Sequence, residues 1–364
     1  MHSWMLALAL VGCSGAHVAG VAPQGAATGG TATEGAAASD GAGGDVGVVP
    51  PATATPVRFA TGMDARATDG KWLYGFAFDG DAIVRVGPFG GTPTLVVATA
   101  PRNDDRAAGV YVQARWWTLA ADAEAVYWSD FDGGSRSRIW RAPSGGGTAQ
   151  LLADVQAGFP LELVLHGSHL YYSDGGLVEM SVAGDARRLV TAGAGTPISV
   201  DDDNAWVVRD GSYHTVVVDR VSLDDGTRTA VGSWTAGDEW PSYWVANDEA
   251  LYAFSALGEV HRVDRMSGAV TLIAGGPDET RLIASAVPMG AAVADGTLYW
   301  DSLYTNGVPY NPPAPRYLTA MPTSGMGGRA LVQSIGADSP GGALVVWGDS
   351  VYYTGGGGVW RVAR

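Results

Sequence analysis

The chain has 364 residues, including 53 glycines and 13 tryptophans, and a formal net charge of −15. Binding to nucleic-acid phosphates needs clustered Lys and Arg side chains, whereas Lys71 is the sole lysine, so the composition excludes a nucleic-acid-binding protein. Abundant glycine and aromatic residues suit many short strands joined by tight turns, and long amphipathic helical patterns are scarce.

The N-terminus carries an apolar run, Trp4 to Val11, that is too short to span a bilayer but has the length of a signal-peptide core. It leads into Leu10-Val11-Gly12-Cys13, which resembles the bacterial lipobox, and Cys13 is the sole cysteine. The resemblance implies a lipid on the thiol of Cys13. Ser14 follows, which in Gram-negative lipoproteins favours the outer membrane. We therefore expect residues 1–13 to be a lipoprotein signal peptide with its lipobox cysteine, and the protein to be exported and lipid-anchored to the bacterial cell envelope.

Residues 14–55 consist mainly of Gly, Ala, Thr, Val and Pro. Such a segment cannot bury enough apolar area to offset its conformational entropy. We expect a disordered tether between the anchor and the folded body.

An alternating apolar run closed by an aromatic residue recurs seven times between residues 56 and 364. Successive aromatic anchors are 35 to 53 residues apart, about the length of a four-stranded propeller blade. We therefore predict an all-β fold, a seven-bladed β-propeller over residues 56–364, with six or eight blades as alternatives. The anchor pairs are Leu73-Tyr74, Val126-Tyr127, Leu170-Tyr171, Ala205-Trp206, Leu251-Tyr252, Leu298-Tyr299 and Val351-Tyr352.

The second repeat shows the four predicted strands of a blade, from innermost to outermost. They are Trp116 to Ala120, Ala125 to Ser129, Ile139 to Ala142 and Gln150 to Ala153. The last repeat ends after its third strand, Val359 to Val362, and Pro56 to Gly62 resembles the outer-strand run Arg188 to Gly193. We therefore expect the N-terminal strand to complete the last blade, which removes an exposed sheet edge.

Two segments carry a recognisable motif. Tyr127-Trp128-Ser129-Asp130, followed by Ile139-Trp140-Arg141-Ala142, and Tyr171-Tyr172-Ser173-Asp174 resemble the YWTD repeat of low-density-lipoprotein-receptor-type propellers. Bacterial lipoproteins with a YWTD-like or NHL-like propeller are the closer description. The resemblance implies a binding or scaffolding surface, with the motif residues themselves structural.

Candidates for chemistry are few. The run Asp201-Asp202-Asp203-Asn204 could form a calcium site, because calcium binds clustered carboxylate and carbonyl oxygens. It falls, however, at the turn between inner and anchor strands, where Asp and Asn side chains cap backbone groups. We therefore favour a structural turn. The six histidines form no ligand pattern. We expect no cofactor. The alternative is a propeller hydrolase or lyase with a divalent ion in the central channel, for which Asp64 and Glu162 are weak metal candidates.

Irregular loop lengths concentrate on one predicted face, where strands 2 and 3 connect and where one blade leads to the next. A rigid ring with variable loops suits recognition of a protein, peptide or glycan by a monomer. A passive structural role in the envelope is a third alternative. The candidate binding residues are Tyr304, Asn306, Tyr310 and Asn311 in the insertion Ser302 to Arg316, followed by Trp116, Trp117, Trp234, Trp240 and Trp244.

Overall fold

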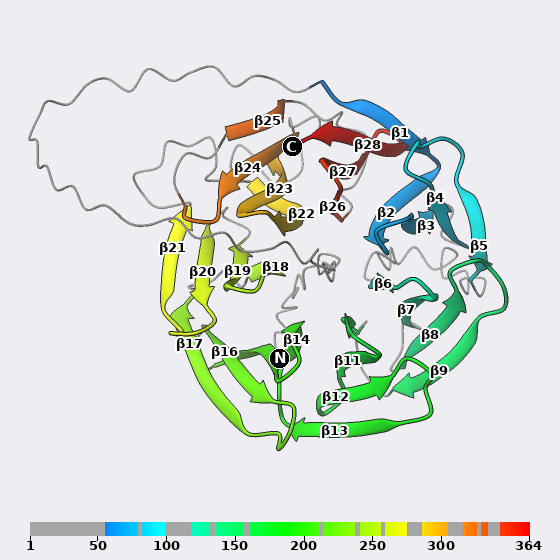
Figure 1. Cartoon of the computed structure of the whole chain (residues 1–364). Helices are drawn as coiled ribbons and strands as arrows, with labels where there is room; N and C mark the ends of the chain where they lie inside the picture. Colours follow the sequence, from blue (N-terminus) through cyan, green and yellow to red (C-terminus); the bar gives the residue numbers. More distant parts are fainter. Residues whose placement is uncertain are drawn as a thin grey trace, which may run out of the picture.

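The computed structural model is a ring of seven four-stranded antiparallel sheets around a central axis (Figure 1). It describes residues 55–78, 82–99, 118–131, 136–155, 161–211, 214–236, 241–255, 259–274, 286–304, 316–325, 329–333 and 343–364. The predicted all-β, seven-bladed propeller is therefore confirmed, and the described residues contain no helix. None of them offers a helix that could cross a membrane.

The blades follow one another along the chain, and blades 1 to 6 each run from the innermost to the outermost strand. Blade 1 comprises β2 (Met63–Thr68), β3 (Leu73–Ala77), β4 (Ala82–Val86) and β5 (Thr94–Ala98); blade 2 comprises β6 (Leu119–Ala121), β7 (Ala125–Phe131), β8 (Ser137–Pro143) and β9 (Gln150–Val155). Blade 3 comprises β10 (Val164–His166), β11 (His169–Ser173), β12 (Gly176–Ser181) and β13 (Arg187–Ala192); blade 4 comprises β14 (Thr196–Val200), β15 (Asn204–Asp210), β16 (Thr215–Ser222) and β17 (Arg228–Thr235). Blade 5 comprises β18 (Pro241–Ala246), β19 (Ala250–Ser255), β20 (Val260–Asp264) and β21 (Val270–Ala274); blade 6 comprises β22 (Ala286–Ala294), β23 (Thr297–Tyr304), β24 (Arg316–Pro322) and β25 (Arg329–Gln333). Blade 7 comprises β26 (Val345–Trp347), β27 (Ser350–Gly355), β28 (Gly358–Ala363) and β1 (Val57–Thr61).

The aromatic anchors lie on the second strand of each blade and are all buried. Successive side chains of a strand point to opposite faces of its sheet, and neighbouring blades cover both faces. Tyr352 and Tyr353 in β27 are therefore both buried, although they face opposite blades. This arrangement accounts for the continuous apolar runs around each anchor.

The N-terminal strand closes the ring as predicted. β1 pairs antiparallel with β28, with Val57 opposite Arg361 and Thr61 opposite Gly358. Only Gly62, with a φ of 74°, separates β1 from β2 of blade 1. The chain therefore passes from the outer rim of blade 7 to the channel wall of blade 1 within one residue (Figure 1).

A bulge recurs in the outer strand of all seven blades, at the same place in its pairing with the third strand. In several seams a glycine from the next blade sits directly on the bulge. A Cβ on Gly268 would lie 1.7 Å from the carbonyl oxygen of Val231, and one on Gly90 would lie 2.4 Å from that of Phe59. Close packing of successive blades therefore requires glycine at these turns.

The motif hydroxyls join successive blades. Ser129 in blade 2 donates a hydrogen bond to the carbonyl oxygen of Leu161, just before the inner strand of blade 3, at 2.7 Å. Thr354 in blade 7 follows Tyr352-Tyr353 as Ser129 follows Tyr127-Trp128; it donates to the Asp64 carboxylate at 2.9 Å and accepts from the backbone N–H of Ala65 at 3.2 Å. These contacts agree with the interpretation of the motif residues as structural.

Candidate binding surface

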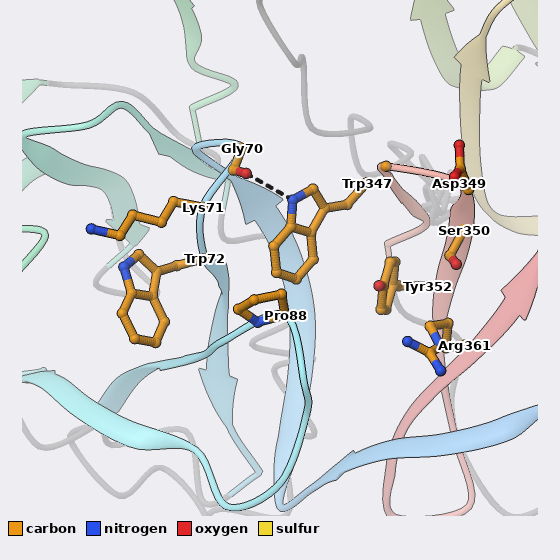
Figure 2. A pocket seen from close by; sticks show the side chains of 10 residues that line it. Gly70, Lys71, Trp72, Pro88, Trp347, Asp349, Ser350, Tyr352 and Arg361 are labelled. Carbon is orange, nitrogen blue, oxygen red and sulfur yellow. Dashed lines mark hydrogen bonds between the residues drawn. The ribbon is translucent and has the colours of Figure 1, made fainter.

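A groove of about 560 Å³ lies at the seam where the ring closes, between blades 7 and 1. Figure 2 shows its walls, which come from the turns β2–β3, β4–β5 and β26–β27 and from the strands β27 and β28. The groove therefore opens on the face that carries the turns between first and second strands. Its lining residues include Lys71, Trp72, Pro88, Trp347, Tyr352 and Arg361.

The blade 1 wall is built by an Asp-capped turn. One carboxylate oxygen of Asp69 accepts hydrogen bonds from the backbone N–H groups of Lys71 at 2.8 Å and Trp72 at 2.6 Å. The other oxygen accepts a hydrogen bond from the Tyr74 hydroxyl at 2.9 Å. Burial is the main cause that raises the pKa of this hydroxyl, and the neighbouring Asp69 carboxylate raises it further. The guanidinium of Arg85 lies 4.3 Å from the centre of the Trp72 ring. This turn therefore holds Lys71 and Trp72 in place at the rim.

The blade 7 wall rests on the closing strand. The indole N–H of Trp347 donates to the Gly70 carbonyl oxygen at 3.0 Å, which ties the two walls together (Figure 2). Phe59 of β1 packs edge-on against Tyr352, with ring centres 4.8 Å apart, and against Trp347 at 6.4 Å. Because Phe59 supports both rings, the shape of the groove depends on closure of the ring.

The groove carries an excess of positive charge. Lys71 is exposed, and Arg361 is half-buried with its guanidinium 5.9 Å from the centre of the Phe59 ring. Burial raises the pKa of the Tyr352 hydroxyl, while Arg361 opposes the shift, so this tyrosine stays neutral at physiological pH. Among the described residues, Asp349 is the one carboxylate lining the groove, and Arg364 lies 3.8 Å from it.

The two weak metal candidates belong to different blades. Asp64, on β2, accepts hydrogen bonds from Arg66 at 2.8 and 2.5 Å and from Thr354, so its carboxylate is already engaged. Glu162 lies just before β10, and burial raises its pKa to about 8. Across the part of the chain that the structure describes, no three His, Cys, Asp or Glu side chains come together as a metal site.

The acidic run in blade 4 forms the predicted turn. The Asp201 carboxylate accepts the backbone N–H groups of Asp203 at 3.0 Å and Asn204 at 2.8 Å. Asp202 is exposed and lies 2.9 Å from the ring of His166. Asp69, Asp122 and Asn247 cap the same turn in other blades, so this is a repeated feature of the fold.

The structure brings together two of the predicted binding tryptophans. Trp234 of blade 4 lies 5.8 Å from Trp244 of blade 5, centre to centre, and stacks on His261 at 5.0 Å. Both indoles are half-buried against the apolar core between these blades, and burial lowers the pKa of His261. Their rings therefore pack at the seam between blades 4 and 5.

The other predicted binding residues are not described. Trp116, Trp117, Trp240, Asn306, Tyr310 and Asn311 lie outside the described residues, as does the side chain of Tyr304 at the end of β23. Their grouping on one loop-rich face stays a prediction.

Sequence reasoning missed the seam groove, because its two walls come from opposite ends of the chain. Two signals could have indicated it. The sole lysine stands beside Trp72 in one turn, and Trp347 precedes Gly348-Asp349 in the matching turn of the last repeat. Aligning these two turns across the closed ring would have placed the tryptophans at one seam.

Comparison with known proteins places the chain by fold alone. No protein-family model matches it, and no curated protein matches it. The structure of YCF48 bound to D1 peptide is similar with a TM-score of 0.56 and 8% identity, covering 86% of this chain and 98% of that one. YCF48 from Cyanidioschyzon merolae gives a TM-score of 0.55 at 10% identity, covering 86% and 99%. The computationally designed Ika8 protein gives 0.50 at 12% identity, covering 84% and 99%.

Proposed function

We propose that this chain is a non-catalytic binding or scaffolding module for a protein or peptide, held at the bacterial cell envelope by a lipid on Cys13. The observation that carries the binding role is the groove at the closing seam, which has two tryptophans, a proline and two cations in its lining. Rigid aromatic side chains supply contact area at low entropic cost and are enriched in binding hot spots. A peptide-bound structure of YCF48 supports the choice of ligand class, since that propeller has the same overall fold.

The envelope location rests on the N-terminal sequence. The apolar run before Cys13 and the lipobox resemblance support export, lipidation and, through Ser14, the outer membrane. Two or more acyl chains on this cysteine would supply stable anchoring without a membrane-spanning helix.

Selection of peptides from a random displayed library on the purified full chain tests the binding role. Peptides that bind should lose at least tenfold in affinity for a Trp72→Ala/Trp347→Ala double variant. The matched control is Trp234→Ala, which removes an indole from the seam between blades 4 and 5 and should leave the affinity unchanged. Failure to select any peptide would refute the proposed function.

The same peptides distinguish the seam groove from the loop-rich face. Deletion of residues 305–315 should leave their affinity unchanged if they bind at the seam. Loss of binding in this deletion, with normal binding by the double variant, would move the binding surface to the insertion that contains Tyr310 and Asn311.

A further inference from the structure

The cations of the seam groove lack carboxylate partners within the described part of the chain. Several arginines elsewhere are paired, as Arg138 is with Asp130 at 2.8 Å and Arg209 with Asp219 at 2.6 Å, whereas others, such as Arg85, contact a carbonyl oxygen and an aromatic ring instead. No carboxylate of a described residue lies within ion-pair distance of Lys71 or Arg361. Carboxylates are in excess in this chain, which has 37 acidic and 22 basic residues, yet none of the described ones pairs with these two cations.

The one acidic side chain of the groove does not cancel this charge. Asp349 lies 3.8 Å from Arg364, which also pairs with Asp295 at 2.5 Å. The groove therefore presents positive charge within a protein that is negative overall. A half-buried guanidinium such as that of Arg361 gains most from a charge-assisted, bidentate contact with a carboxylate.

Apolar surface continues from the groove onto the neighbouring turn. Pro88 lines the groove, and the next residue, Phe89, is 98% exposed at the tip of the turn between β4 and β5. Phe89 directly follows a groove-lining proline in the chain, so it adds exposed apolar area next to the groove. The combination suits a ligand that carries apolar and anionic groups in alternation.

We propose that the seam groove binds an extended acidic peptide segment, with a carboxylate held by Lys71 and Arg361 and an apolar side chain against Trp72 and Trp347. This inference rests on the proposed function and specifies its ligand. A peptide fits better than an acidic polysaccharide, because the two tryptophans and the proline of the lining offer contacts for apolar side chains, which a polysaccharide lacks. Phe89 would also find an apolar partner in a peptide.

Fluorescence anisotropy of labelled heptapeptides on the full chain tests this inference. The probe is the amidated peptide Glu-Leu-Glu-Pro-Leu-Glu-Phe, and the comparison peptide has Gln in place of each Glu. We expect the acidic peptide to bind at least tenfold more tightly than its Gln counterpart. Lys71→Gln should weaken the acidic peptide about threefold and Arg361→Gln about tenfold, because the less exposed cation forms the stronger contact.

Arg58→Gln is the matched control for charge. Arg58 is exposed on β1, donates to the Gly356 carbonyl oxygen at 3.0 Å and does not line the groove. It changes the net charge as much as Lys71→Gln does, so equal effects of the two variants would mean a general field effect and would overturn the inference. Thermal unfolding of each variant verifies that it is folded.

The outcomes separate this inference from the function on which it rests. Equal binding of the acidic and Gln peptides, lost from both in the Trp72→Ala/Trp347→Ala variant, would overturn the acidic preference and leave the peptide-binding function standing. Binding of oligogalacturonate alone, sensitive to Lys71→Gln, would assign the groove to a polysaccharide and overturn the inference. If neither probe class binds at millimolar concentration, both the ligand class and the seam as the binding site are refuted.

Discussion

Truncation of Phe59 should open the closing seam and remove support from the groove at the same time. The side chain is 6% exposed at the bulge of β1, in edge-on contact with Tyr352 and Trp347. Replacing a buried Phe by Ala costs about 3–5 kcal/mol, and the aromatic pairing adds roughly 0.5–1.5 kcal/mol to the contribution of the ring. We therefore expect Phe59→Ala to lower the free energy of unfolding by about 4 kcal/mol.

Phe89→Ala is the matched control, since it removes the same side chain from a site that is 98% exposed. Its effect should stay within about 0.5 kcal/mol. Urea unfolding followed by tryptophan fluorescence compares the two variants, and hydrogen exchange of the β28 amides reports whether β1 has detached. Similar urea midpoints for Phe59→Ala and Phe89→Ala would refute the claim that β1 closes the ring through this side chain.

Gly268→Ala should destabilise the protein by at least about 3 kcal/mol, because the added Cβ would overlap the Val231 carbonyl oxygen. The control is Gly167→Ala, at a similar φ of 55° but with open space around the site, which should cost only about 1 kcal/mol. Equal urea midpoints for the two variants would contradict the seam packing. Burial raises the pKa of Glu162 to about 8, so its contribution to stability is complete below about pH 4.5 and is lost as the pH rises through 8. Glu162→Gln should therefore raise the melting temperature relative to wild type at pH 8 but not at pH 4.5, and a pH-independent difference would show that the carboxyl is not shifted. Labelled palmitate should be incorporated in cells, and Cys13→Ser should abolish the label; a labelled variant would refute the anchor.

The sequence predicted the blades well because their pattern is local. Each aromatic anchor stands in an apolar run beside an Asp or Gly turn, so the second strands of the repeats could be located from short windows. Closure by residues 56–62 was also predictable, because the last repeat visibly lacked its outer strand. The innermost strand of blade 2 was expected from Trp116 to Ala120; Leu119–Ala121 forms a strand there, and Trp116 and Trp117 lie outside the described residues.

The seam features could not be predicted in the same way. The hydrogen bond from Trp347 to Gly70 joins residues 277 positions apart, and no sequence window contains both. The bulged residue of each outer strand is apolar, as Phe59 and Val231 are, but apolar residues are common throughout the strands, so the bulge could not be located from the sequence. Charge pairing could not be predicted from the sequence either. Arg361 lacks a carboxylate partner among the described residues because of the register of β28, which the sequence does not specify.

The single-residue link through Gly62 couples two parts of the ring mechanically. A force applied along β1 from its N-terminal side loads the ladder with β28 in shear, so several hydrogen bonds must break together before the strand slides. Because only Gly62 separates Thr61 from Met63, further displacement of β1 would then pull directly on β2, the innermost strand of blade 1. In a protein tethered upstream of Val57, the outer rim of blade 7 would thus bear the tension first, and the rest of the ring would be protected until that ladder fails.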